Sequence, residues 1–444
     1  MSAADAVDER AAEVLQALIR NACVNDGRPT SGHEARNADT LEAVLAGPGL
    51  EIERFEPAPG RVSLVTRIRG ADPAAPTLLY DASIDVASTD PSGWSRDPFG
   101  GDRVDDEVWG RGSLGALHHA ATFAVAIRHL ADRGFRPDGT LVFVAGADGH
   151  TGGDLGAGHL LAHHPDAVRA DWVVADSVGP MFPTPRGPAL PVTVAEKGYH
   201  PFRVHVRGED RLAMAAVEVT AVERAAGAIT SISRYQAPGR SWPLFLDGLA
   251  LTGLDVTMPG LARAGGTQDA VIASIPPPLF GLFLEQTRPT VHLLGVHGRA
   301  LAGRSSGHLT IDLAARTFPG EDDAAERLLL DALGDALGPH PEIEVLPARS
   351  GALSAASGPL WEALAASTAG SGGGVAVPLL SMKLTASNRY RESGATTYGV
   401  DAFSPTTDAI TITNRISSGI DERIDVASLA NLTRLWTELA TRLL

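Results

Sequence analysis

The sequence predicts a mixed α/β fold that is interrupted by a smaller α+β insert. Segments with helical spacing alternate with short apolar segments along the first 197 residues, which is typical of a parallel or mixed sheet covered by helices. After residue 197 the pattern changes to a strand, an Ala-rich helix, a Gly- and Pro-rich loop and two further strands. Helical spacing returns after residue 319. We therefore expect residues 1–197 and 319–444 to form one α/β domain and residues 198–318 to form the insert.

In the first part, apolar residues recur every three or four positions in two early segments and in one that follows Gly112. This spacing predicts helices at 7–21, 35–46 and 113–133. Apolar runs predict strands at 50–55, 62–69, 77–80, 141–145 and 172–175. The run at 141–145 lies between glycines and contains β-branched and aromatic residues, which indicates a buried parallel strand.

In the remainder of the chain, the same reasoning predicts strands at 202–206, 290–294 and 307–314 and helices at 211–231 and 322–337. From residue 398 to the end we expect a strand, an irregular turn and an amphipathic helix.

Composition limits the classes of function. The chain has 37 Lys and Arg against 53 Asp and Glu, a net charge of -16, which disfavours nucleic acid and anionic membranes as partners. A single cysteine, Cys23, excludes an internal disulfide framework. The acidic, amphipathic start has no basic leader or long apolar run, and it predicts a cytoplasmic first helix. We expect a small-molecule substrate.

The segment from Leu78 to Gly112 has an order of elements that presents side chains at a sheet edge. An apolar strand leads into an acidic turn, an aromatic and proline loop, and a glycine-rich turn before a helix. Open α/β sheets place their sites at the carboxyl ends of such strands. This segment is therefore the first place to look for a functional site.

Several motifs along the chain resemble those of the zinc exopeptidases of peptidase family M-20, which include aminoacylases, carnosinase-like dipeptidases and succinyl-diaminopimelate desuccinylases. The matching motifs include LLYDASIDV, WSRDPFGG, VWGRGSLG, VFVAGADGHTGGDLGAGHLL, RPTVHLLGV and SSGIDERIDV. The resemblance implies a zinc-exopeptidase-like catalytic domain with a mixed sheet and an inserted ferredoxin-like lid domain. It also implies a homodimer formed through the lid.

The resemblance further implies a site with two zinc ions, but this chain departs from the family at most ligand positions. Family ligands and the general-base Glu correspond here to Ser83, Gly115, Gly149, His150 and Ser418. Asp176 is the ligand that remains, together with Asp85, which orients the first histidine in the family. A serine hydroxyl is a poor zinc ligand, and glycine has no side-chain ligand atom. We therefore expect no dinuclear zinc site and no cofactor. A new mononuclear site built from His150, Asp176, His118 and His119 stays open.

The candidate catalytic residues are groups that hold or move protons. His150 titrates near neutrality and can act as a general base if Asp176 or Asp85 orients it. Ser83 is a candidate nucleophile if His150 or His118 reaches it, although no G-x-S-x-G motif supports this. The alternative is that the two carboxylates are only held by backbone amides and that His150 is a solvated polar residue.

The candidate substrate-binding residues are Arg389, Asn388, Lys197 and Trp94. The arginine lies in the region that the resemblance assigns to a substrate carboxylate, and Asn388 replaces the family's arginine there. Lys197 fits a carboxylate or a hinge, and Trp94 fits a substrate platform or loop packing. Arg111, between two glycines, is expected to form a structural ion pair.

Three functions follow from these observations. The first is a metal-independent enzyme that acts on an amino-acid-derived, acyl-amino-acid or dipeptide-like molecule, by condensation, cyclisation, elimination or amide transfer. Its place in specialised metabolism rests on analogy alone. The second is a non-catalytic pseudo-peptidase that binds a ligand or a partner subunit. The third is a residual metal-dependent amidohydrolase.

Overall fold

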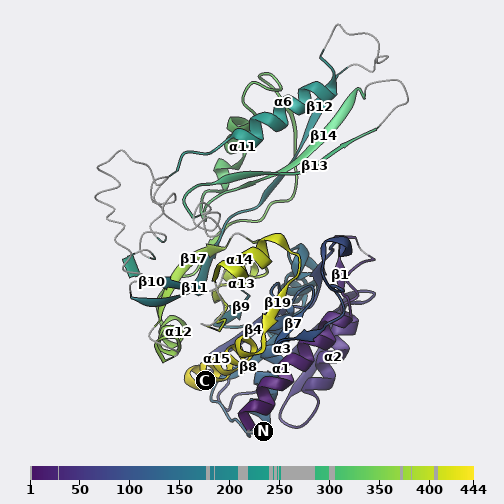
Figure 1. The fold of residues 1–444 in the computed structure, drawn as a ribbon. Coiled ribbons are helices and arrows are strands. Elements are labelled where there is room, and N and C mark those ends of the chain that lie inside the picture. Colours follow the sequence, from purple (N-terminus) through teal and green to yellow (C-terminus); the bar gives the residue numbers. More distant parts are fainter. Residues whose placement is uncertain are drawn as a thin grey trace.

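A ten-stranded mixed sheet forms the centre of the larger of two lobes in the computed structural model (Figure 1). The structure describes residues 3–28, 30–176, 181–184, 186–208, 219–239, 244, 248, 250–251, 286–299, 306–370, 374–381, 383–404 and 409–444. Both labelled ends of the chain lie in the larger lobe (Figure 1).

The main path of the large sheet has eight strands, in the order β10 (Phe182–Thr184), β11 (Gly187–Glu196), β18 (Thr396–Val400), β9 (Trp172–Ala175), β4 (Thr77–Ser83), β8 (Thr140–Gly146), β3 (Arg61–Ile68) and β2 (Glu51–Ala58). Two more strands, β16 (Ala352–Leu353) and β17 (Val375–Ser381), pair with β11. The expected strand at 141–145 corresponds to β8, which is parallel to β4 and antiparallel to β3.

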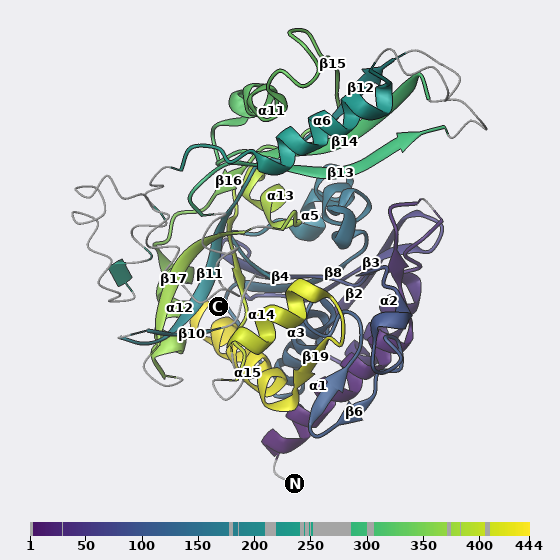
Figure 2. The same cartoon turned by 45° about the horizontal axis from the view of Figure 1, so that its top comes forward.

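Helices cover both faces of this sheet (Figure 2). The helices of the larger lobe are α1 (Ala3–Arg20), α2 (Ala35–Leu45), α3 (Leu117–Asp132), α4 (His159–His163), α5 (Pro165–Val168), α12 (Pro359–Gly370), α13 (Ser387–Glu392), α14 (Ala409–Ser418) and α15 (Val426–Leu443). Successive residues of a strand point to opposite faces. Accordingly Leu78 and Tyr80 join the core under α1, α3 and α15, whereas Leu79 joins the core under α4 and α13.

A two-stranded sheet and a three-stranded sheet complete the larger lobe. They are β1 (Val24–Asn25) with β5 (Val86–Ala87), and β19 (Arg423–Asp425) with β7 (Glu107–Trp109) and β6 (Arg103–Val104). Among the residues that the structure describes, no helix is both long and apolar enough to cross a bilayer.

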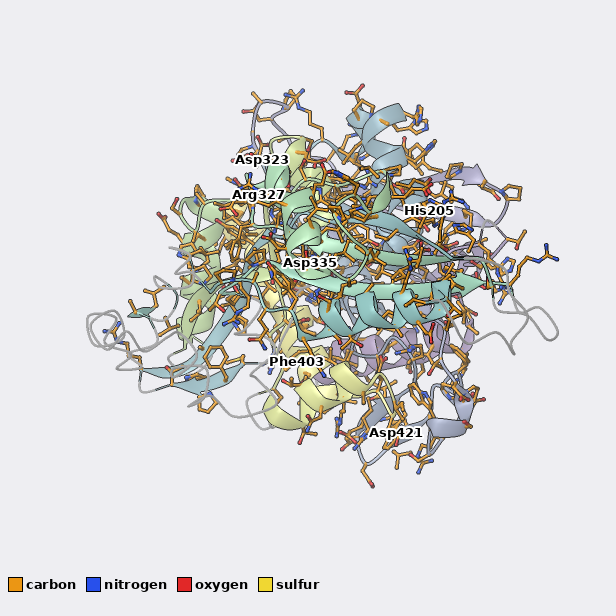
Figure 3. The ribbon with its side chains drawn as sticks, turned by 90° about the horizontal axis from the view of Figure 1, so that it is seen from above. His205, Asp323, Arg327, Asp335, Phe403 and Asp421 are labelled. Carbon is orange, nitrogen blue, oxygen red and sulfur yellow. The ribbon has the colours of Figure 1, made fainter. Side chains whose placement is uncertain are left out.

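The smaller lobe is a four-stranded antiparallel sheet with two helices. Its strands are β12 (His200–Arg207), β13 (Thr290–Gly298), β14 (His308–Arg316) and β15 (Glu342–Val345), and its helices are α6 (Ala221–Arg234) and α11 (Ala325–Leu333). The chain order is β-α-β-β-α-β and the sheet order is β13-β14-β12-β15, which is the ferredoxin-like arrangement. Figure 3, seen from above, labels His205 on this sheet and Asp421 on the larger lobe.

The end of the insert predicted at residue 318 is too early. Leu328, Leu329 and Leu333 of α11 pack in one core with Val204 and Ile311 of the small sheet. β15 adds a fourth strand beside β12, so the packing unit continues to Val345. The sequence pattern missed this because α11 has the same amphipathic spacing as helices of the larger lobe.

Two predicted helices differ in their bounds. The helix expected at 322–337 ends at Leu333, because the next residue, Gly334, has a φ of 53° and starts a turn. Of the helix expected at 211–231, residues 211–218 lie outside the described residues, and the described part begins at Ala221.

Candidate functional site

A cavity of about 360 Å³ lies at the carboxyl ends of the central parallel strands. Ser83 ends β4, Asp176 follows β9, and His150 lies in the turn after β8. Parallel strands bring their carboxyl ends to one sheet edge, so residues distant in sequence converge there. Of the predicted catalytic residues, Ser83, Asp85, His150 and Asp176 line this cavity. His118 does not line it in the described part of the chain.

Asp85 is buried beneath the turn that carries His150. One carboxylate oxygen accepts a hydrogen bond from Asn25 Nδ2 at 2.8 Å, and both oxygens accept from the His150 backbone N–H at 3.2 and 3.3 Å. Burial, with the nearby Glu34 and Asp148 charges, raises the pKa of Asp85 to about 7. The bonds show that Asp85 positions the backbone of the turn, and the structure shows no hydrogen bond between Asp85 and the imidazole.

Asp176 faces a lysine that the sequence interpretation did not single out. Lys383 Nζ lies 3.3 Å from Asp176 Oδ2, and both residues line the cavity. Burial opposes the charge of Lys383, but the Asp176, Asp401 and Glu422 carboxylates outweigh it and raise the pKa of the lysine. Lys383 follows β17, more than two hundred residues after Asp176, so local patterns could not reveal the pair.

A buried ion network holds the turn before His150. Arg61 makes two hydrogen bonds to Glu34, at 2.7 and 2.8 Å, and a third to Asp148 Oδ1 at 2.9 Å. Asp148 adopts a left-handed backbone with a φ of 61°, and its oxygens also accept from Asn25 and from the Leu155 N–H. These contacts fix where the chain turns after β8.

His150 is exposed, and its ring lines the cavity. Desolvation by the surrounding walls, together with the Arg111 and Lys383 charges, lowers the pKa of His150. The imidazole is therefore held in its neutral form, which is the form that accepts a proton.

Ser83 and Gly149 lie against each other. A β-carbon added at Gly149 would lie 1.7 Å from Ser83 Oγ and 2.4 Å from Ser83 Cβ. Only glycine leaves room for the serine at this point. Within the described part of the chain, the Ser83 hydroxyl makes no hydrogen bond, so it is available to a ligand in the cavity.

Asp81 is a further cavity residue that the sequence interpretation missed. Its carboxyl is buried, and its Oδ1 accepts a hydrogen bond from the Tyr390 hydroxyl at 2.9 Å. Burial, with the nearby Asp176 charge, raises the pKa of Asp81 to about 7. A signal was present, because Asp81 and Ser83 are two positions apart on β4 and so point to the same face of the sheet.

Arg111 forms the structural ion pair expected from its place between glycines. Its guanidinium contacts the Glu422 carboxylate, and Glu422 also accepts from the Gly112 N–H at 2.9 Å. Both charged residues line the cavity. The cavity therefore holds two opposite-charge pairs, this one and Lys383 with Asp176.

His118 and its neighbour His119 do not line the cavity, and both face Asp401. Both are buried in α3, and both Nε2 atoms lie close to Asp401 Oδ1, at 3.0 and 3.2 Å. Burial, together with the neighbouring His118, lowers the pKa of His119 to about 4. No contact between His118 and Ser83 is seen, so the structure does not bring these two together as a nucleophile and its base.

The predicted substrate-binding residues also lie outside the cavity lining. Lys197 is buried and donates to the Arg288 carbonyl at 2.8 Å. Trp94 donates from Nε1 to Thr89 Oγ1 at 2.8 Å, which is a packing role in its loop.

Arg389 and Asn388 are likewise engaged with the protein. Arg389 donates to the Gly152 carbonyl at 3.3 Å and contacts the Asp154 carboxylate. Asn388 is buried and donates to the Ser350 carbonyl at 3.1 Å. These bonds tie the segment after β17 to its neighbours.

The side chains present do not fit the dinuclear zinc site that the resemblance implies. Ser83 offers only a hydroxyl, and Gly115 and Gly149 offer no side-chain donor. A carboxylate at position 149 would collide with the serine. Ser418, at the position of the final histidine, is exposed and does not line the cavity.

The ammonium group of Lys383, beside Asp176, also argues against a dinuclear zinc site. The remaining family ligand is paired with the Lys383 ammonium group, whose positive charge repels a divalent ion. Of the residues that the structure describes, one group alone gathers three metal-ligating side chains, and it is His118, His119 and Asp401.

Comparison with known sequences identifies relatives of this chain. A family profile described as "Peptidase family M20/M25/M40" matches residues 79–442. Aminoacylase-1 of Mus musculus is 28% identical over 195 residues, which cover 43% of this chain and 46% of the relative. Succinyl-diaminopimelate desuccinylase of Cereibacter sphaeroides is 30% identical over 139 residues, which cover 31% of this chain and 33% of the relative. In both relatives the matched segment spans less than half of the relative's length.

Comparison with solved structures extends over the whole fold. The M20 family metallo-carboxypeptidase Sso-CP2 from Sulfolobus solfataricus superposes with a TM-score of 0.71 at 16% identity, covering 100% of this chain and 99% of that chain. The di-peptidase Dug1p from Saccharomyces cerevisiae gives a TM-score of 0.73 at 13% identity, covering 99% and 96%. At such low identity the likeness shows the fold.

Proposed function

The chain belongs to peptidase family M20/M25/M40, and from that premise we propose that it is an enzyme that acts without zinc on a small amino-acid-derived substrate. The proposed chemistry is proton transfer by side chains, in a condensation, cyclisation, elimination or amide transfer on an acyl-amino-acid or dipeptide-like molecule. The observation that carries the proposal is the cavity, which keeps proton-transfer groups where the family's metal ligands are absent.

His150 is the proposed general base. Its ring lines the cavity, and its lowered pKa keeps it neutral and ready to accept a proton. The turn that carries it is held by Asp85 through the backbone N–H. A fixed turn keeps the ring where a bound substrate can meet it.

Asp81 is the proposed proton donor. Its carboxyl lines the cavity, and a pKa of about 7 leaves it partly protonated near neutrality. A neutral imidazole that accepts a proton and a carboxyl that is partly protonated near neutrality suit proton transfer in opposite directions.

The charged pairs in the cavity suit a substrate with both an ammonium and a carboxylate group. Lys383 and Arg111 supply positive charge, and Asp176 and Glu422 supply negative charge. The Lys383 ammonium group also suits an oxygen on which negative charge develops. A volume of about 360 Å³ is enough for a dipeptide-sized ligand.

The proposal is tested by turnover of a panel of dipeptides and N-acyl amino acids in the presence of a chelator. We expect wild-type turnover to persist with the chelator and to fall by about 10²-fold or more in His150→Ala. The exposed His340→Ala variant is a matched control and should keep wild-type turnover. Loss of turnover on chelation, restored by about two zinc ions per chain, would instead support a metal-dependent hydrolase.

Asp176→Ala gives a second test of the same cavity. We expect reduced turnover, because the variant leaves the Lys383 ammonium without its carboxylate partner. If both this variant and His150→Ala kept full turnover, the proposed acid/base chemistry would be wrong. Calorimetric binding of a panel compound that is never turned over would favour the non-catalytic alternative.

A further inference from the structure

A cluster of three buried side chains lies outside the cavity lining. His118 and His119 begin α3, and Asp401 directly follows β18. Asp401 Oδ1 lies 3.0 Å from His118 Nε2 and 3.2 Å from His119 Nε2. The Val400 carbonyl oxygen lies 3.0 Å from His119 Nε2. Two imidazole nitrogens and a carboxylate oxygen therefore lie within 4.8 Å of one another, and the Val400 oxygen lies beside one of the nitrogens.

Hydrogen bonds account for two of these three contacts. His118 Nε2 is paired with Asp401 Oδ1, and His119 Nε2 is paired with the Val400 carbonyl. A neutral ring nitrogen carries at most one proton, so the further approach of His119 Nε2 to Asp401 Oδ1, at 3.2 Å, is not explained by a hydrogen bond of its own. Both Nδ1 atoms are buried without a hydrogen-bond partner, so the polar contacts that orient the rings are those at Nε2. A cation between the two Nε2 atoms and the Asp401 carboxylate would contact all three side chains at once.

The spacing suits a transition-metal ion. Ligands at about 2.0–2.1 Å from a tetrahedral zinc ion lie roughly 3.3 Å from one another. The measured separations of 3.0 and 3.2 Å are close to that value. All three ligating side chains offer their atoms within 4.8 Å of one another. Imidazole and carboxylate are ligands that zinc and related divalent ions accept.

We propose that His118, His119 and Asp401, with the Val400 carbonyl, bind one divalent transition-metal ion. The site is closed, because all three side chains are at most 3% exposed, and closed sites of this kind are structural. Phe403, labelled in Figure 3, packs beside His118 with ring centroids 6.0 Å apart and helps to exclude water. The ion would join α3 to the end of β18. None of these side chains is at a family ligand position, and the inference does not depend on the proposed reaction.

The first measurement is zinc content of the full-length protein by mass spectrometry, after chelation, dialysis and titration with Zn²⁺. We expect about one zinc per chain in the wild type and close to none in Asp401→Asn or His119→Gln. His150→Ala is the matched control, because this histidine lies in the cavity, and it should keep the ion. A wild type that binds no zinc would overturn the proposal, as would Asp401→Asn with undiminished zinc or His150→Ala without it.

A second measurement covers the case in which the variants fail to fold. Zn²⁺ added to the chelated wild type should raise its midpoint of thermal unfolding, because an ion that binds only the folded state stabilises it. Co²⁺ should give the visible bands of a site without thiolate ligands. An unchanged unfolding midpoint and the absence of such bands would contradict the site. A zinc content of two ions per chain that is unchanged in Asp401→Asn would contradict both this site and the proposal that the cavity works without metal.

Discussion

A β-carbon at Gly149 would lie 1.7 Å from the hydroxyl oxygen of Ser83. The resemblance places a zinc-binding histidine at one of these positions and a general-base glutamate at the other. In this chain the two positions fit each other only as a serine beside a glycine. The contact therefore explains why a single reversion to the family residue at position 149 would not rebuild a metal site.

Gly149→Ala should destabilise the protein by about 1–3 kcal/mol, because the added methyl group overlaps the serine side chain. The matched control is Gly115→Ala in the same cavity, where the nearest atom to the new methyl group is 3.6 Å away. Adding Ser83→Gly should restore most of the loss. Urea unfolding measures all three, and equal losses at positions 149 and 115 would contradict the packing argument.

Arg61→Met should lower the free energy of unfolding by about 3–5 kcal/mol. The change leaves the buried carboxylates of Glu34 and Asp148 without their cation. Arg54→Met is the control, since Arg54 is 37% exposed and pairs with two exposed acids, so its loss should cost less than about 1 kcal/mol. Similar losses in the two variants, measured by urea unfolding, would show that burial does not decide the effect.

Asp81→Asn should weaken the dependence of stability on pH. The folded state raises the pKa of Asp81 to about 7 from its ordinary value of 3.8, so the folded state binds the proton more tightly than the unfolded chain. The stability that this group contributes is therefore fully present below about pH 4 and falls as the pH rises through 7, by about 1.4 kcal/mol per pH unit at most. Unfolding curves at pH 5 and pH 7 should differ less in Asp81→Asn than in the wild type. The exposed Asp138→Asn variant should keep the wild-type difference.

Leu329→Ala should loosen the smaller lobe. Leu329 is fully buried in the core that α11 shares with the small sheet, and its truncation should cost about 2–5 kcal/mol. The neighbouring Leu330 is 40% exposed, so Leu330→Ala is a matched control with little effect. Amide hydrogen exchange should accelerate in β12 and β14 but not in β4 or β8. Faster exchange confined to the larger lobe would place α11 there, as the boundary at residue 318 implied.

Zinc content distinguishes the proposal for the cavity from the proposal for the buried cluster of His118, His119 and Asp401. The cavity is proposed to work without zinc because Ser83, Gly115 and Gly149 cannot replace the family ligands. The buried cluster is proposed to hold one ion through His119 and Asp401. One zinc per chain that disappears in Asp401→Asn supports the second proposal and leaves the first unchanged.

Much of the fold follows from local patterns in the sequence. The period of apolar residues predicted α2, β3 and β9 close to their observed bounds, and it predicted the presence of α1 and of the terminal helix α15, because this period reflects which face of each element is buried. The end of the insert was predicted too early in the sequence. The spacing of apolar residues in α11 is that of any amphipathic helix, so it does not reveal that α11 packs on the small sheet.

The sequence by itself also determined which chemical groups are absent from the site. Ser83 and Gly115 occupy positions of family metal ligands, and Gly149 occupies the position of the general-base glutamate, in any fold of this chain. The sequence left open whether Ser83, Asp85, His150 and Asp176 meet, and in the structure all four line one cavity because parallel strands bring their carboxyl ends together.

Only the tertiary structure decided the partners of these groups. It places Lys383 beside Asp176 and Tyr390 beside Asp81, and it places His118 beside Asp401, outside the cavity lining. Each of these pairs joins residues separated by more than two hundred positions, so no local period encodes them. They arise because the order of strands in the sheet, and the burial of both its faces, leaves each polar side chain only a few neighbours with which to pair.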